Sequence, residues 1–224
     1  VVRWYGTVED VHEQHLAAEK LKRQAYQDDL TGLPNRRAFV EALRTRLGKT
    51  QEPIGLMVLD MDDFKIVNDR FGHLAGDALL RLFGRYLQAV AQPTEYVARL
   101  GGDEFAFICG NTAGETDLRK RAREIETFLD KRLKANKKSR GSRASIGCTL
   151  GKSGENPDEV FKRADLALYA AKQSGKGKFQ LFDPTIRSVA AQRLEALDLA
   201  RLALREYWIE PYFQPIVSLK TQEL

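Results

Sequence analysis

The chain of 224 residues is 43% hydrophobic and 30% charged, and its 36 basic and 31 acidic residues leave a formal net charge of +5. This composition is that of a soluble globular protein with one well-cored domain plus appendages, or with two small domains. No stretch is long and apolar enough to cross a bilayer, and no secretory signal opens the chain, so the sequence predicts neither a membrane-spanning segment nor a signal peptide within these residues. The positive charge favours anionic ligands.

Two features of the composition leave alternatives open. Cys109 and Cys148 lie in strand-like patterns without metal-ligand spacing, which favours buried free thiols in a reducing cytoplasm over a disulfide. The basic tract over residues 131–143 contains no interleaved aromatics, which favours a solvated helix end and loop over a nucleic-acid patch. We therefore expect a cytoplasmic domain without a nucleic-acid partner or membrane contact of its own, within a protein that could be anchored to a membrane elsewhere.

The N-terminal segment predicts a strand followed by a helix. Residues 3–11 alternate polar and bulky side chains, as a half-exposed strand does. Residues 10–28 are mostly polar with a helical pattern, and Val11, Ala18 and Ala25 recur at intervals of seven. This spacing suits a linker helix that pairs with its own copy, and it suits a lone solvated helix equally well.

The middle of the chain predicts a mixed α/β domain. Gly32 and Pro34 mark a turn before a helix that runs to about Leu47, and residues 54–61 form a short apolar run typical of a buried central strand. The remaining elements are helices at 75–91, 116–133 and 157–173, and strands at 96–99, 104–109, 142–150 and 179–182. The resulting order, β-α-β-β-α-β with extra helices, predicts an α/β fold, specifically an α+β sandwich whose mostly antiparallel sheet is flanked by helices.

Three carboxylates carry the clearest chemical signal. Asp60 ends the apolar run, and Asp103 and Glu104 follow Gly101 and Gly102 in a turn between two later strands. If those strands are neighbours of the apolar run, the acids converge at one edge of the sheet. Carboxylate oxygens in small number suit Mg²⁺, with water and phosphate completing its coordination. The two glycines allow a sharp turn and the close approach of a bulky ligand.

Further polar residues offer a nucleotide-like ligand its contacts. Lys65 provides a compact positive charge for phosphate, although it could equally pair with Asp69 on a helix surface. Asn68 and Asp77 could read the donors and acceptors of a base, and His73 could contact a ligand or be a polar turn residue. Lys172 and Lys176 could clamp phosphate, although basic residues at a helix C-terminus also complement the helix dipole.

These residues resemble one family. Gly101-Gly-Asp-Glu-Phe105 resembles the signature of the GGDEF family of diguanylate cyclases. Asp28–Arg37, Asp60–Asp77 and Ala164–Lys172 are similar to its three other hallmark stretches, and together they cover roughly residues 28–183. The resemblance implies a nucleotidyl-cyclase-like βααββαβ core that condenses two GTP into cyclic di-GMP, with Mg²⁺ or Mn²⁺ as cofactor.

The resemblance also implies residue roles. The metal would be bound by Asp60, the Met61 carbonyl, Asp103 and Glu104, and Asp103 is the suspected base for the ribose 3′-hydroxyl. The catalytic positions would be Asp103, Glu104 and Lys65. The substrate-binding positions would be Asp63, Phe64, Asn68, His73, Asp77, Gly101, Gly102, Lys172 and Lys176. Because each domain holds one GTP, the active species would be a transient homodimer formed through this domain and the linker helix.

One departure from the family pattern concerns inhibition by product. Many family members carry an Arg-x-x-Asp product site shortly before the Gly-Gly turn, and the matching positions here are Gln92 and Glu95. The sequence therefore predicts no strong product inhibition through this site.

The ends resemble parts of other modules, which suggests a piece of a larger sensor protein. Residues 1–9 resemble the tail of a PAS sensor domain, 10–28 form the linker helix, and 29–184 form the GGDEF domain. Residues 185–224 resemble the truncated start of an EAL phosphodiesterase domain, with too few acids for phosphodiesterase activity. The alternative to an active cyclase is a catalytically idle GTP-binding domain that controls an attached EAL phosphodiesterase.

Overall fold

The computed structural model describes residues 24–49, 52–110, 112–135 and 142–186. The predicted PAS tail and nearly all of the predicted linker helix and EAL start lie outside the described residues. Within these ranges, no helix is long and apolar enough to span a membrane. Cys109 and Cys148 are both buried free thiols, as predicted, and the alternative of a disulfide between them is wrong.

The domain is built on one five-stranded sheet with the spatial order β2-β3-β1-β4-β5. Its strands are β1 (Ile54–Asp62), β2 (Tyr96–Gly101), β3 (Glu104–Cys109), β4 (Arg143–Gly151) and β5 (Phe179–Leu181). All neighbouring pairs are antiparallel except β4 and β5, which are parallel. The central strand β1 is buried at every position, because it has a neighbour on each side and helices on both faces. The predicted mostly antiparallel sheet is confirmed.

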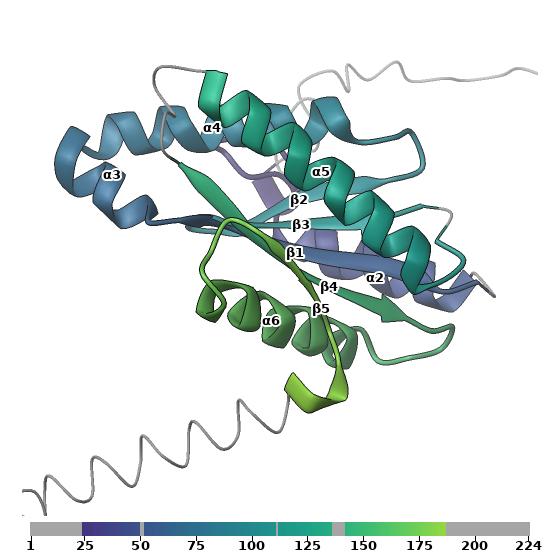
Figure 1. Ribbon diagram of the computed structural model, residues 1–224. Helices are drawn as coiled ribbons and strands as arrows, with labels where there is room; N and C mark the ends of the chain where they lie inside the picture. Colours follow the sequence, from purple (N-terminus) through teal and green to yellow (C-terminus); the bar gives the residue numbers. More distant parts are fainter. Residues whose placement is uncertain (1–23, 50–51, 111, 136–141, 187–224) are drawn as a thin grey trace, which may run out of the picture. The chain divides into compact units, whose positions relative to one another are not determined.

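Helices cover both faces of this sheet (Figure 1). They are α2 (Arg36–Lys49), α3 (Phe64–Phe71), α4 (His73–Val90), α5 (Glu115–Ala135) and α6 (Pro157–Gln173). Helices α4 and α5 lie on one face, and α2 and α6 lie on the other. From β1 to β4 the order is βααββαβ, as the family resemblance implies.

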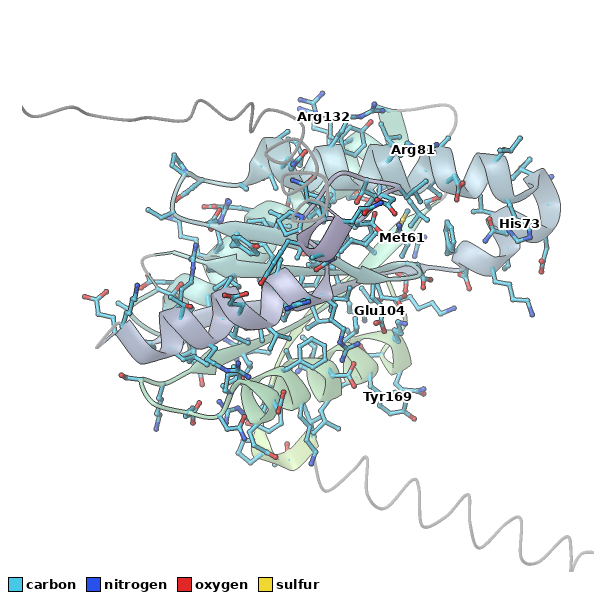
Figure 2. All side chains as sticks on the ribbon, turned by 180° about the vertical axis from the view of Figure 1, so that it is seen from behind. Met61, His73, Arg81, Glu104, Arg132 and Tyr169 are labelled. Carbon is cyan, nitrogen blue, oxygen red and sulfur yellow. The ribbon has the colours of Figure 1, made fainter. Side chains whose placement is uncertain are left out.

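Most predicted boundaries differ from the observed ones by one or two residues, and the one difference in element number lies before α4. The long helix expected from residue 75 starts at His73, and a separate helix, α3, precedes it. Gly72, with φ +81°, separates the two helices, and Figure 2 shows His73 at the outer end of α4. Helix α3 is only eight residues long and contains no fully buried residue, so its apolar positions are too few for the periodicity to separate it from α4.

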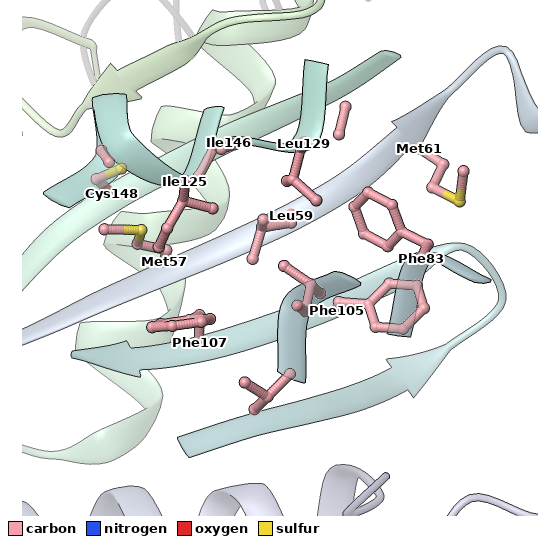
Figure 3. Close-up of a cluster of buried hydrophobic side chains, with 14 of the residues drawn as sticks. Met57, Leu59, Met61, Phe83, Phe105, Phe107, Ile125, Leu129, Ile146 and Cys148 are labelled. Atoms are coloured by element: carbon pink, nitrogen blue, oxygen red, sulfur yellow. The ribbon is translucent and has the colours of Figure 1, made fainter. Parts of the chain in front are cut away.

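The alternation of side chains along β1 divides the core in two. Met57, Leu59 and Met61 face α4 and α5, where they pack with Phe83 and Phe105 (Figure 3). The other set of β1 side chains faces α2 and α6 and includes Leu56 and Val58. Because strand side chains alternate with period two, Asp60 and Asp62 share the face of Leu56 and Val58. Both acids therefore point toward α6.

Candidate active site

The three predicted metal-binding acids meet at one edge of the sheet. Asp60, near the end of β1, lies directly opposite Glu104 in the antiparallel register of β1 and β3. The backbone N–H of Met61 donates to the carbonyl oxygen of Asp103 at 3.3 Å, which joins the end of β1 to the Gly-Gly turn. In Figure 2, Met61 and Glu104 lie on neighbouring strands between α4 and α6. The end of β1 and the Gly-Gly turn are therefore neighbours, as the sequence predicted, and metal binding by these acids stays a prediction.

Asp60 is the buried member of this cluster. Its carboxylate is 9% exposed and lies 2.7 Å from the Nζ of Lys172, in the last turn of α6. Burial raises the pKa of Asp60 to about 6, the hydrogen bond and charge of Lys172 oppose the rise, and the charges of Asp103 and Glu104 add to it. A carboxyl group whose pKa is raised by burial and by neighbouring acids favours a bound cation.

The oxygen donors fit a metal that is shared with a ligand. Within the described ranges, no three His, Cys, Asp or Glu side chains are grouped so as to hold a metal by themselves. Mg²⁺ usually takes one or two carboxylates and completes its shell with water and substrate phosphates. Asp103 and Glu104 repel the negative charge of Asp60, and a bound Mg²⁺ ion would reduce this repulsion. The residues therefore fit a magnesium site that a phosphate-bearing ligand completes.

The predicted base-contacting residues lie at the α3–α4 corner, directly after β1. The Oδ1 atom of Asn68 is buried and has no hydrogen-bond partner. It lies against Gly76, where an added Cβ would be 1.9 Å from that oxygen, so a larger residue at this position would displace the Asn68 amide. Asp77 is half-buried in the next turn of α4 and His73 is exposed. An orphaned buried acceptor is unusual, and a ligand that donates a hydrogen bond would satisfy it.

A connection that the sequence analysis missed holds the loop after α6 against β1. The buried carboxylate of Asp62 accepts hydrogen bonds from Ser145 Oγ at 2.7 Å and from the backbone N–H of Gly177 at 2.8 Å. Next to it, Lys176 Nζ lies 2.7 Å from Asp63 Oδ1. Asp62 thus positions the loop that carries Lys176. The only feature of the sequence that points to Asp62 is its position two residues after Asp60, on the same face of the strand.

The Gly-Gly turn is held by two residues outside the predicted site, Asp28 and Arg99. Arg99, the third residue before Gly102, donates two hydrogen bonds to the Gly102 carbonyl, and its guanidinium is bound by Asp28. The family resemblance covered Asp28 only as part of an entry turn. The pair fixes the backbone next to Asp103 and Glu104.

The sheet order, together with an acid-lined Gly-Gly turn opposite the end of the central strand, defines the GGDEF class of domain. The family model described as "Diguanylate cyclase, GGDEF domain" matches residues 25–178. The chain therefore belongs to the GGDEF family, as its resemblance to the four motifs predicted.

Some relatives of the chain are named diguanylate cyclases and others are named cyclic di-GMP phosphodiesterases. The chain is 35% identical to the diguanylate cyclase DgcP of Pseudomonas aeruginosa over 77% of its length, and 31% identical to the cyclic di-GMP phosphodiesterase PdeR of Escherichia coli over 93%. It spans 26% and 32% of these proteins. The structure of the coiled coil and GGDEF domain of DgcB from Caulobacter crescentus, in complex with c-di-GMP, matches with a TM-score of 0.65 and 31% identity, covering 77% of this chain and 93% of that one.

Proposed function

We propose that this domain is a diguanylate cyclase that condenses two GTP molecules into cyclic di-GMP and two pyrophosphates. The observation that carries the proposal is the position of three acids: Asp60 lies opposite Glu104, its carboxyl group is influenced by the charge of Asp103, and Lys172 contacts it. The similarity to DgcP supports it. Because the chain spans about a third or less of its curated relatives, we further propose that it works within a larger sensor protein with an EAL domain.

The proposed binding roles follow the position of each residue. The divalent cation, Mg²⁺ or Mn²⁺, neutralises phosphate charge, and its donors are Asp60, the Met61 carbonyl, Asp103 and Glu104. The triphosphate is held by the ammonium groups of Lys65, Lys172 and Lys176 and by the backbone amides of Asp63 and Phe64, and it lies against Gly101 and Gly102.

Guanine binds at the α3–α4 corner in this proposal. Asn68 and Asp77 contact the base, and His73 lies at the rim. The unpartnered Oδ1 atom of Asn68 supports this assignment, because the N–H groups of guanine are the donors that such an acceptor lacks. The half-buried carboxylate of Asp77 is a second acceptor for the same edge of the base.

The bond-forming step needs two domains. In each, Asp103 accepts the proton of the ribose 3′-hydroxyl, the freed oxygen attacks the α-phosphorus of the GTP on the other domain, and the bond from that phosphorus to pyrophosphate breaks. The two sites must therefore face each other in a transient homodimer. Three exposed apolar side chains at the α3–α4 corner, Ile66, Phe71 and Leu74, are 58%, 63% and 85% exposed. They offer a second copy an apolar contact beside the site.

The second candidate is a GTP-binding regulatory domain without catalysis. The name of PdeR, a phosphodiesterase that aligns with 93% of this chain, favours it. The two candidates share the nucleotide site and differ only in turnover, so binding alone does not separate them.

The test is to incubate the protein with GTP and Mg²⁺ at concentrations that permit dimers, and to quantify cyclic di-GMP and pyrophosphate. Asp103→Ala and Lys65→Ala should each lower turnover about 100-fold or more, as expected for the loss of a proton acceptor or a phosphate contact. Lys134→Ala, on the exposed side of α5, is the matched control and should turn over normally. GTP binding without product would support the regulatory domain, and no GTP binding would exclude both functions.

A further inference from the structure

Asp60 and Lys172 neutralise each other in the ligand-free domain. Lys172 Nζ lies 2.7 Å from Asp60 Oδ2, and the two side chains are 35% and 9% exposed. The proposed function assigns both residues to ligands of opposite charge, Asp60 to the divalent cation and Lys172 to phosphate. Neither residue can make its ligand contact in full while the ion pair persists.

A divalent cation at Asp60 would compete with the ammonium group of Lys172. Mg²⁺ binds carboxylate oxygens at about 2.1 Å, and Lys172 Nζ contacts the same carboxylate at 2.7 Å, so the two cations compete for the negative charge of Asp60. A cation on the other oxygen would place two positive charges on one buried carboxylate, where water and salt screen their repulsion poorly. We therefore expect a metal at Asp60 to weaken the contact between Asp60 and Lys172. A triphosphate would give the displaced ammonium group a new partner.

We propose that the Lys172 ammonium group and the divalent cation are alternative partners of Asp60, so that the metal binds weakly until a nucleotide draws Lys172 away. This inference rests on the proposed function, because it takes a nucleoside triphosphate as the ligand that captures Lys172. Metal and nucleotide then bind cooperatively, since each removes the competitor of the other. Lys172 thereby links metal occupancy of the site to the presence of nucleotide.

The pair between Lys176 and Asp63 is a built-in control. Its Nζ–Oδ1 distance is also 2.7 Å, but the two side chains are 45% and 54% exposed, and Asp63 is not among the proposed metal ligands. Lys176 shares the residue type and the proposed phosphate role of Lys172. Removal of its charge should weaken nucleotide binding without uncovering a metal ligand.

The experiment is a titration of the nucleotide-free protein with Mn²⁺ at pH 8, followed by the electron paramagnetic resonance signal of the free ion. Lys172→Met should raise the affinity for Mn²⁺ about tenfold or more, the change expected when one charge-assisted hydrogen bond no longer competes. Lys172→Arg, which keeps the charge, should restore weak binding. Lys176→Met should stay within about twofold of wild type, since exposed pairs contribute little.

Two results would overturn the inference: equal Mn²⁺ affinity in wild type and Lys172→Met, or an equal gain in Lys176→Met. Circular dichroism of each variant shows whether the fold is retained, and Lys172→Arg provides a second comparison in a folded protein of unchanged charge. Binding of 3′-deoxy-GTP, which lacks the attacking hydroxyl, should weaken in both methionine variants. A protein that forms no cyclic di-GMP but shows the Mn²⁺ difference would refute the proposed cyclase activity and leave the competition at Asp60 intact.

Discussion

The guanidinium of Arg99 donates to both carboxylate oxygens of Asp28, at 2.9 and 3.0 Å, across 71 residues of sequence. The same guanidinium donates to the Gly102 carbonyl at 2.7 and 3.1 Å. Burial raises the pKa of Asp28, but hydrogen bonds from Thr31 and Arg99 outweigh it and hold that pKa below its usual range. Asp28 is therefore charged at neutral pH and anchors the Gly-Gly turn through Arg99.

Asp28→Asn should lower the free energy of unfolding by about 2–3 kcal/mol, because the largely buried guanidinium loses its counter-charge. Urea unfolding measures this loss. Asp130→Asn removes an exposed i,i+4 pair with Lys134 and should cost less than about 0.5 kcal/mol. Similar losses in the two variants would show that Asp28 is not a structural anchor.

Asp60→Asn should stabilise the metal-free protein at pH 8. The pKa of Asp60 is about 6 in the folded domain, against an ordinary 3.8. Between these values the folded state binds more protons than the unfolded state, so stability falls as pH rises toward 6 and stays lower above it. Asparagine cannot ionise, and it still offers Lys172 an acceptor. The expected gain is about 1–3 kcal/mol at pH 8, and it should shrink toward pH 4.

Thermal unfolding in the presence of EDTA at the two pH values checks this expectation. Asp62→Asn is the comparison on the same strand face. It alters an acceptor that Ser145 and Gly177 both use, so it should lose stability. If Asp60→Asn lowers the stability equally at both pH values, the charged carboxylate stabilises the fold and the prediction is wrong.

Gln92→Arg should not create a product-binding site. Glu95, at the matching acidic position, is 1% exposed, and its carboxylate accepts hydrogen bonds from Arg121 at 2.5 and 2.8 Å. A ligand would have to break this largely buried ion pair, and Arg121 would keep only the more exposed Glu124 as its ionic partner, which is costly. Calorimetry should detect no binding of cyclic di-GMP at low micromolar concentration to wild type or to Gln92→Arg through this site. Inhibition that mutation of Gln92 or Glu95 abolishes would contradict the prediction.

Gly147→Ala should move α6 away from β4. A Cβ at this position would lie 2.1 Å from both the Ala164 carbonyl oxygen and the Leu168 backbone nitrogen. Both are backbone atoms of α6 and cannot rotate away, so we expect a loss of about 2–3 kcal/mol and weaker binding at Lys172. Gly48→Ala, in α2 with no atom within 4 Å of the added Cβ, should be neutral or stabilise by up to about 1 kcal/mol. Urea unfolding of both variants measures the difference.

Leu74→Asp should impair turnover at low protein concentration, because charged groups at the α3–α4 corner of both copies would repel each other when the sites meet. GTP affinity should stay unchanged, since Leu74 is 85% exposed and is not a proposed substrate contact. Higher protein concentration should restore part of the rate. A rate per protein that falls equally at all concentrations would argue against this surface as the dimer contact.

The sequence by itself determined the family, the central strand and the acids of the site. These features are local: the apolar run of β1 has the length and character of a buried strand, and the signature at residues 101–105 occupies one turn. The periodicity did not resolve α3 as a separate helix, because α3 has only eight residues and none of them is fully buried; the family resemblance did imply two helices between the first two strands.

Only the tertiary structure decided which charges meet. Asp28 and Arg99 are 71 residues apart, and Asp62 and Gly177 are 115 apart. The pairing of Asp60 with Lys172 depends on the packing of α6 against the face of the sheet toward which Asp60 points. Periodicity predicts which face of its own strand or helix a side chain occupies, but the partner on another element depends on the order of strands and the packing of helices, which no local pattern contains.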